Sequence, residues 1–261
     1  MELRSLRYEK HGRVGVMTFD TPAALNAISE LRLAEMELLL TGIEADTELG
    51  ALIITGGEGR AFCVGLDLEL LERAFGDMIY FETVVRRLNV IISRLEALAV
   101  PTIAAVNGIT RAGGFELTMG CDFVLIADDA RYGDVHTDSG VLPAAASLRL
   151  KRRIGEQRAK EMIWTARWYT GPEAVAAGLA LRSVPRGELQ AEALAFAARM
   201  TDKPRAVIAA SKRVFQQGVD AGLAEGAEIE LRNFVAYMDS EPYGHEGYKA
   251  FREGRQPSWK P

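Results

Sequence analysis

The chain has 261 residues, of which 48% are hydrophobic and 26% are charged. These values are typical of globular proteins, and they exclude a collagen, a disordered chain and a small disulfide scaffold. The net charge is −5, from 31 basic and 36 acidic residues, whereas a protein that binds duplex nucleic acid usually carries a basic stripe. The composition therefore predicts one large domain, or one domain with an appendage, and no nucleic-acid partner.

The two cysteines, Cys63 and Cys121, lie in apolar or glycine-rich surroundings, so we predict that both are buried and reduced. No CxxC or Cys/His spacing suggests a metal site, and no metal is expected. The first ten residues lack the apolar region of a signal peptide. The longest apolar runs fall short of the roughly 18 residues that span a bilayer. We therefore expect a cytoplasmic protein with no membrane contact.

The first half of the chain alternates predicted strands and helices. Residues 3–9 and 13–19 alternate loosely, which predicts a hairpin. Ser29 is placed to cap a helix that carries Glu35 and Glu37 on its polar face. Short apolar runs predict buried strands, and two longer segments have helical spacing. The predicted strands are 51–55, 102–106 and 123–127, and the helices are 77–98 and 113–120.

After Pro143 the pattern is mostly helical. The predicted helices are 147–165, 172–178, 187–200, 204–217 and 220–239. No linker rich in Pro, Gly or Ser divides the chain, and no internal repeat is visible. Strand–helix units followed by helices predict an α/β protein with a sheet-based core and a helical C-terminal layer.

The first candidate functional segment is 56–67, GGEGRAFCVGLD, between a predicted strand and a helix. A dinucleotide-binding loop starting at Gly57 needs a third glycine at position 62, where Phe62 stands. No GKS or GKT is present, which excludes a P-loop. What remains is a tight turn with free backbone N–H groups near Leu66, and many such turns are only strand–helix connections.

The second candidate segment contains Gly113, Gly114 and Glu116. Glycines at the start of a helix leave N–H groups unpaired and approachable, and the helix dipole favours negative charge there. The oxygen of a thioester that turns into an enolate is a suitable guest. Glu116 lies one turn further in. It either stabilises the helix or, if buried among apolar neighbours, has a raised pKa suited to acid–base work.

The third candidate segment places Asp134, His136, Asp138 and Ser139 within six positions. His136 is either a structural histidine or a proton carrier. A Ser/His/Asp triad can be drawn from these residues. However, the chain has no GxSxG elbow, and residues so close in sequence rarely converge on one another. The sequence therefore disfavours a serine hydrolase.

Together these segments resemble the crotonase superfamily, also called the enoyl-CoA hydratase/isomerase family. The matching stretches, in the family's order, are LNA at 25–27, GRAFCVGLDL at 59–68, VPTIAAVNG at 100–108, AGGFELTMGCDFVLIAD at 112–128 and SGVLP at 139–143. The resemblance implies repeated β-β-α turns that form a superhelical core over residues 1–195. It also implies a helical oligomerisation region over 196–261, which assembles homotrimers or hexamers made of two trimers.

The resemblance further implies acyl-CoA thioester substrates, with coenzyme A as part of the substrate and no tightly bound cofactor. The oxyanion hole of the family falls on the backbone N–H groups of Leu66 and Gly113, and its first catalytic glutamate on Glu116. The adenine contact falls near Val64. The other substrate-binding positions fall on Ala24, Asn26, Gly65, Gly114 and Pro143.

The sequence departs from the family pattern at the second catalytic glutamate, where His136 stands. Glu116 and His136 can share the acid–base work of a hydratase-like lyase, because histidine titrates near neutral pH. The histidine can equally mark an isomerase, a hydrolase of C–C bonds or a non-catalytic acyl-CoA binder. Two basic residues common in the family are also replaced, by Ala23 and Gly254, although Arg252 and Arg255 lie near the second position. These replacements weaken the expected binding of coenzyme A and leave an acyl-carrier or CoA-free substrate open.

Overall fold

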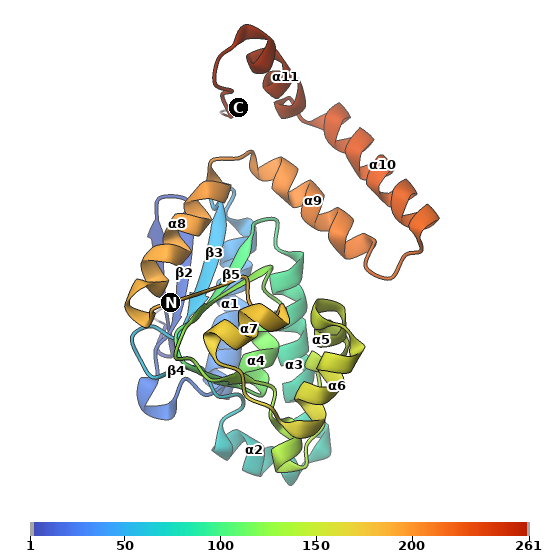
Figure 1. Cartoon of the computed structure of the whole chain (residues 1–261). Coiled ribbons are helices and arrows are strands. Elements are labelled where there is room, and N and C mark those ends of the chain that lie inside the picture. The colour runs from blue at the N-terminus through green and yellow to red at the C-terminus, as the bar shows by residue number, and fades with distance from the viewer. Residues whose placement is uncertain (1–2, 260–261) are drawn as a thin grey trace.

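A six-stranded sheet forms the centre of the protein in the computed structural model (Figure 1). The structure describes residues 3–259, so the outermost residues of the two predicted regions lie outside it. The sheet strands, in spatial order, are β1 (Leu6–His11), β2 (Val14–Phe19), β3 (Ala51–Thr55), β5 (Thr102–Val106), β7 (Phe123–Ala127) and β9 (Arg182–Val184). β1 and β2 form the predicted antiparallel hairpin, and all later pairs are parallel.

A second, three-stranded sheet was not predicted. It consists of β4 (Ala61–Cys63), β6 (Ile109–Arg111) and β8 (Tyr132–Gly133). Each of the pairs β3/β4, β5/β6 and β7/β8 gives its first strand to the large sheet and its second to the small one. Helices α2 (Leu68–Phe75), α3 (Met78–Ala97), α4 (Gly113–Met119) and α5 (Ala146–Ile154) follow these pairs. This repeated β-β-α arrangement confirms the crotonase-type α/β fold.

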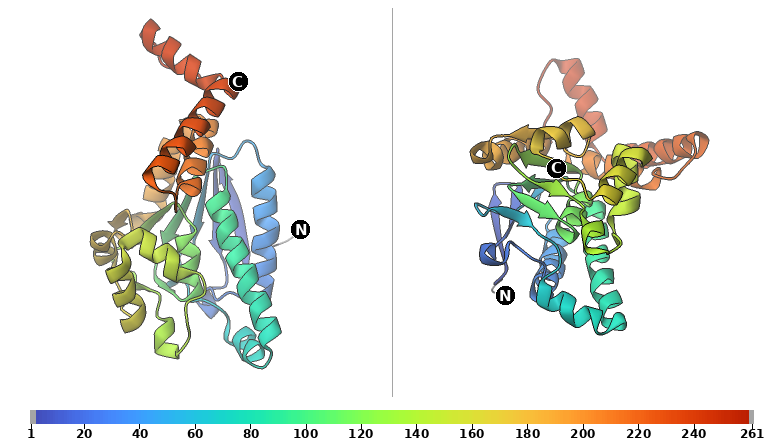
Figure 2. Two further views of the ribbon diagram at one scale, coloured as in Figure 1. Left: turned by 90° about the vertical axis from the view of Figure 1, so that its right-hand side faces the viewer. Right: turned by 60° about the horizontal axis from the view of Figure 1, so that its bottom comes forward.

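Helices cover the large sheet. α8 (Leu189–Thr201) packs on β2, β3, β5 and β7 (Figure 1). α1 (Glu30–Ala45) and α3 lie side by side, as the left view of Figure 2 shows. Both predicted buried cysteines are confirmed as free and buried.

Helix α1 begins where the sequence predicts, because the Ser29 side chain accepts a hydrogen bond from the N–H of Arg32. The prediction for Glu35 is wrong, since its side chain is only 1% exposed. Its carboxylate accepts hydrogen bonds from the backbone N–H groups of Arg4 and Ser5 and from the Ser5 hydroxyl. The N-terminal segment therefore covers the helix face that periodicity alone assigns to solvent. The prediction for Glu37 is confirmed: its side chain is partly exposed and forms an ion pair with Arg87.

The second half is more broken than predicted. The segment 147–165 is two helices, α5 and α6 (Glu156–Thr165), separated at Gly155, which has a φ of +81°. α7 (Gly171–Ala177) is followed by the unpredicted strand β9. In the described part of the chain, no helix is long and apolar enough to cross a bilayer.

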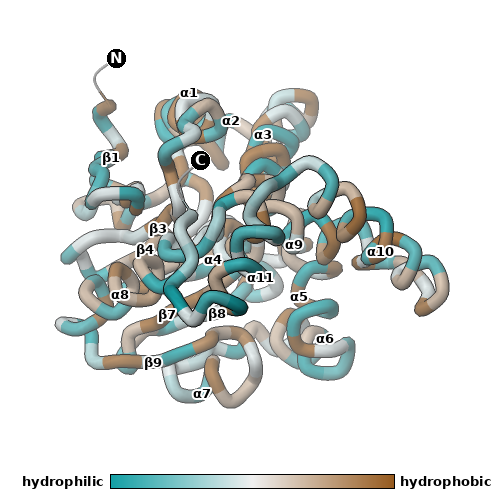
Figure 3. The backbone as a smooth tube through the Cα atoms, turned by 90° about the horizontal axis from the view of Figure 1, so that it is seen from above, coloured by the Kyte–Doolittle hydropathy of each residue, from teal (hydrophilic) through white to brown (hydrophobic). Residues whose placement is uncertain are grey.

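Three helices follow α8: α9 (Arg205–Gln217), which packs on α3, and then α10 (Leu223–Ser240) and α11 (Tyr243–Glu253), which lead away from the core (Figure 1). Figure 3 shows hydrophobic and hydrophilic residues mixed along α10. Large apolar side chains are exposed on these helices: Phe215, Leu223, Leu231, Phe234, Val235, Tyr248 and Phe251. The predicted boundary at 195/196 lies inside α8, which packs on the sheet. The part of the chain that leads away from the core therefore begins later than this boundary.

Candidate active site

Two backbone turns that are far apart in the sequence meet at Gly65 and Gly113. A Cβ atom added to Gly65 would lie 3.0 Å from the backbone nitrogen of Gly113, and Gly65 has a φ of +92°. The N–H of Ile28 donates to the Gly65 carbonyl, and the N–H of Asp67 donates to the Ile28 carbonyl. These bonds fix the turn on both sides of Leu66, whose own N–H has no hydrogen-bond acceptor among residues 3–259.

Gly113 is the first residue of α4, so its N–H has no acceptor within the helix. The residue before it, Ala112, has a φ of +48°, which is unusual for a side chain with a Cβ. Such a conformation costs roughly 1–3 kcal/mol and persists only where the surroundings enforce it. Here the N–H of Ala112 donates to the Asp134 carbonyl at 2.9 Å, and its carbonyl accepts from the N–H of Glu116 at 2.9 Å.

Close packing, rather than an unusual φ, requires a glycine at position 114. A Cβ at this position would lie 2.1 Å from the carbonyl oxygen of Cys63, so α4 can approach β4 only with glycine here. The start of α4 and the Leu66 turn are therefore held together, and each contributes an unpaired N–H.

Glu116 lies one turn into α4 and is only 2% exposed. Its Oε1 accepts hydrogen bonds from the N–H groups of Ala145 at 2.7 Å and Ala146 at 3.2 Å, at the start of α5. Burial raises the pKa of Glu116, and the nearby Asp134 acts in the same direction. The charge of His136 and the backbone hydrogen bonds only partly offset this. Of the two alternatives that the sequence leaves open for Glu116, the buried carboxyl group with a raised pKa is the one that agrees with the structure.

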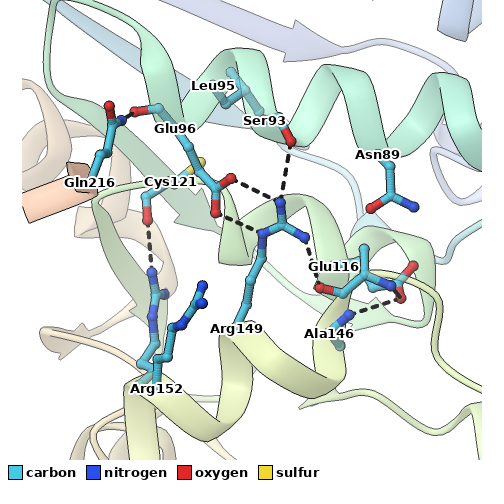
Figure 4. Close-up of polar contacts among 12 residues, drawn as sticks. Asn89, Ser93, Leu95, Glu96, Glu116, Cys121, Ala146, Arg149, Arg152 and Gln216 are labelled. Atoms are coloured by element: carbon cyan, nitrogen blue, oxygen red, sulfur yellow. Dashed lines mark hydrogen bonds and ion pairs between the residues drawn. The ribbon is translucent and has the colours of Figure 1, made fainter. Parts of the chain in front are cut away.

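The start of α5 is held against α3 by Arg149 (Figure 4). Its guanidinium donates to both carboxylate oxygens of Glu96, at 2.7 and 2.9 Å, and to the Ala145 carbonyl at 3.1 Å. The N–H groups that bind Glu116 are thus fixed from outside the candidate site. Sequence reasoning missed them because any residue type can supply a backbone N–H.

His136 lies close to Glu116, which the sequence alone could not show. Its Nδ1 is 2.9 Å from Oδ1 of Asp134, a fully buried residue. Polar atoms of Glu116, Asp134 and His136 all lie within 4.8 Å of one another. Burial lowers the pKa of His136, but the hydrogen bond and charge of Asp134, with the charge of Glu116, outweigh it and leave the pKa raised.

The second carboxylate oxygen of Asp134 is buried without a hydrogen-bond partner in the described structure. Such an atom costs about 1–3 kcal/mol, so it calls for an explanation. The three side chains are of types that can bind a divalent metal ion. However, Asp134 and His136 are already hydrogen-bonded to each other, and this contact is typical of an acid–base pair.

The other predicted site residues lie in different environments. Asn26 is fully buried, and its side chain bonds only to backbone, at Thr21, Gly56 and Ala61. The carbonyl of Val64 accepts a hydrogen bond from Arg111 at 3.3 Å. Ala24 is exposed, and Pro143 is buried shortly before α5.

Asp134 and His136 do meet, contrary to the expectation for residues so close in sequence. Ser139 and Asp138 are exposed, so the structure adds no support for a serine nucleophile. A large cavity, with a volume of 1160 Å³, lies elsewhere, at the C-terminal end of α4 beside α9. Neither Glu116 nor His136 lines it. The candidate chemistry therefore depends on the polar cluster rather than on this cavity.

We expect the free energy of unfolding to fall as the pH rises from about 6 to about 8, because the folded protein binds more protons than the unfolded chain. His136 contributes stability that is fully present below its unfolded pKa, about 6.5, and is lost as the pH rises through its raised folded pKa. The raised pKa of Glu116 acts with the same sign, above the ordinary value of 4.5.

Urea titrations at both pH values check this expectation. The variant with both Glu116→Gln and His136→Gln should lose most of the pH dependence, whereas His11→Gln, at an exposed position, should keep it. An equal slope in the double variant and the wild type would contradict the account.

Comparison with known proteins gives consistent matches over the whole chain. Residues 9–261 match the sequence family described as enoyl-CoA hydratase/isomerase. The chain is 34% identical over 264 residues to a protein named probable enoyl-CoA hydratase in Mycobacterium bovis, covering 99% of each. It is 31% identical to the short-chain-enoyl-CoA hydratase of Clostridium acetobutylicum, covering 98% of this chain and 97% of that one. The crystal structure of an enoyl-CoA hydratase from Bacillus anthracis matches with a TM-score of 0.93 and 30% identity, covering 98% of this chain and 99% of that one.

Proposed function

Because the chain belongs to the enoyl-CoA hydratase/isomerase family, we propose that it is a hydratase-like lyase that adds water to 2-enoyl-CoA thioesters. The observation that carries this proposal is the closeness of Glu116 and His136, whose polar atoms lie within 4.8 Å of each other. Glu116 lies on α4, which starts at Gly113, and His136 begins the 3₁₀ helix His136–Ser139. Coenzyme A enters as part of the substrate, and the proposal requires no tightly bound cofactor.

The unpaired N–H groups of Leu66 and Gly113 are proposed to bind the thioester oxygen. This oxygen gains negative charge as an enolate forms, and donors fixed in advance need no reorganisation at that moment. Removal of one such donor typically costs about 10²–10³ in kcat. The strained Ala112 and the close packing at Gly114 support this role, because both hold the two donors in fixed positions.

In the proposed reaction, one of Glu116 and His136 takes a proton from water as its oxygen bonds to Cβ. The π electrons of the Cα–Cβ bond move toward the thioester oxygen, and the other group delivers a proton to Cα. Both groups suit this exchange, because burial raises the pKa of Glu116 and the carboxylates of Asp134 and Glu116 raise the pKa of His136. The overall change is the addition of one water molecule.

The Asp134–His136 pair favours a second candidate within the same family. A histidine held by a carboxylate can move a proton between carbon atoms, as in double-bond isomerisation, or activate water for C–C bond hydrolysis. These reactions use the same oxyanion site. They differ in whether the product is an isomer or two fragments.

The exposed apolar side chains of α9–α11 support a further proposal, that this region assembles a homotrimer or a hexamer. Apolar groups such as Phe215, Leu223 and Phe251 are 80%, 93% and 84% exposed in the single chain. Exposed apolar patches of this kind are typical of protein–protein interfaces.

The test is a substrate panel with purified protein. It contains 2-enoyl-CoA esters of several chain lengths, a 3-enoyl-CoA ester and a cyclic β-diketone, and products are identified by mass. We expect loss of the enoyl thioester absorbance and a gain of one water mass. Asp138→Asn, at an exposed position near His136, is expected to match the wild type. An unchanged mass with a moved double bond would replace hydration by isomerisation. Binding of the esters without turnover would contradict both.

A further inference from the structure

Asp134 is the most deeply buried acid near the candidate site, and the acid–base scheme above does not use it. It lies directly after β8 and is 0% exposed. One carboxylate oxygen, Oδ1, faces both His136 Nδ1 at 2.9 Å and the His136 backbone N–H at 3.3 Å. The other oxygen has no partner among the residues that the structure describes. No lysine or arginine pairs with this carboxylate in the described chain; its one recorded ion-pair partner there is His136.

Burying a carboxylate without a cation is costly unless a partner can become positive. His136 is the only such partner recorded for Asp134, and it is the residue that stands where the family resemblance implies a second glutamate. Of the His136 side chain, 15% is exposed, whereas the Asp134 side chain at its Nδ1 is 0% exposed. The Asp134 carboxylate therefore lies on the Nδ1 side of the His136 ring, in the protein interior.

We propose that Asp134 is a positioning residue that holds the proton of neutral His136 on Nδ1 and leaves Nε2 free to exchange a proton with the substrate. This inference rests on the proposed function and specifies how its histidine works. A hydrogen bond to one ring nitrogen decides which nitrogen carries the proton. The same carboxylate stabilises the imidazolium that forms when Nε2 accepts a proton.

The charged groups around His136 are few. Asp134 follows β8, and Glu116 comes from α4; both favour the protonated ring. Helix α6 packs against the short 3₁₀ helix His136–Ser139, but its ionisable side chains, Glu156, Arg158, Lys160 and Glu161, are all exposed. Asp138 is exposed as well, and Arg149 acts on Glu116 from α5. The proton of His136 is thus governed mainly by Asp134 and Glu116.

The first test measures the histidine itself and needs no turnover. The chain has only three histidines, and His11 and His245 are exposed, so the ring nitrogens of ¹⁵N-labelled protein can be assigned by substitution. We expect neutral His136 to carry its proton on Nδ1 in the wild type. In Asp134→Asn the pKa of His136 should fall and the preference for Nδ1 should weaken. His11 and His245 should not change, and an unchanged circular dichroism spectrum should show that the variant is folded.

The second test measures turnover of whichever substrate the panel identifies. Asp134→Asn is expected to lower kcat about 10²–10⁴-fold with little change in KM. The limb of the pH–rate profile that belongs to His136 should move to lower pH. Asp138→Asn removes the same charge four residues further on, and it should leave both kcat and the profile unchanged.

A double variant separates positioning from a general structural effect. If Asp134 acts through His136, adding Asp134→Asn to His136→Gln should cause no further loss of kcat. A similar loss in both backgrounds would overturn the proposal, and so would an unchanged His136 pKa and tautomer in Asp134→Asn. If instead His136→Gln keeps full activity while the nuclear magnetic resonance results hold, the proposed function of the histidine fails and its positioning by Asp134 stands.

Discussion

Replacing Glu116 with glutamine is expected to lower kcat about 10²–10⁴-fold, because the amide cannot exchange a proton with the substrate. The folded protein should be as stable as the wild type or more stable. The pKa of Glu116 is raised, which means that burial disfavours the charge the substitution removes. The glutamine oxygen can still accept from Ala145 and Ala146. Steady-state kinetics and urea unfolding measure the two effects.

Glu35 provides the matched control. It is also a buried glutamate, but hydrogen bonds from Ser5 and Arg4 outweigh the effect of burial and lower its pKa. Its charge therefore stabilises the folded state, and this contribution is present above the unfolded pKa and lost as the pH falls. Glu35→Gln should reduce stability and leave kcat intact. If both variants lose stability and neither loses rate, Glu116 is structural.

Replacing Lys212 with methionine is expected to lower the free energy of unfolding by about 1–3 kcal/mol, because it removes the hydrogen bonds of the ammonium group to Asp122 and to two backbone carbonyls. The Lys212 ammonium lies 2.6 Å from Asp122 and also donates to the carbonyls of Leu95 and Val100. Only 9% of its side chain is exposed. These contacts attach α9 to the core, so the loss should be visible as a lower urea midpoint.

Lys160→Met is the control for this prediction. Lys160 forms an ion pair of the same length, 2.6 Å, with Glu156, but both side chains are about half exposed. Pairs of this kind contribute about 0–1 kcal/mol. Equal losses in the two lysine variants would show that burial of the Lys212 pair does not matter for attaching α9.

Much of the fold is predictable because the main strands and helices have clear patterns. The strands 51–55, 102–106 and 123–127 agree with the structure residue for residue. The small sheet was missed because strands of two or three residues are too short to show a period. The break at Gly155 was missed although a glycine inside a helical pattern is a local signal for one. The burial of Glu35 was missed because it depends on Arg4 and Ser5, which are distant in sequence.

The candidate site was predictable only in part. The glycines and Glu116 stand in motifs that indicate the chemistry. In contrast, the approach of His136 to Glu116 depends on how the β6 and β8 segments pair. The hydrogen bonds from Ala145 and Ala146 come from the backbone and have no sequence signal. In this chain the segment after Pro143 supplies these N–H groups from alanines.

A structure with a bound, non-reactive acyl-CoA analogue tests the central claim most directly. We predict that the thioester oxygen lies about 2.7–3.1 Å from the backbone nitrogens of Leu66 and Gly113. A Glu116 oxygen and His136 Nε2 should lie about 2.6–3.2 Å from Cα, Cβ or a bridging water. A thioester bound away from both N–H groups, or a His136 ring beyond this reach with no bridging water, would contradict the account.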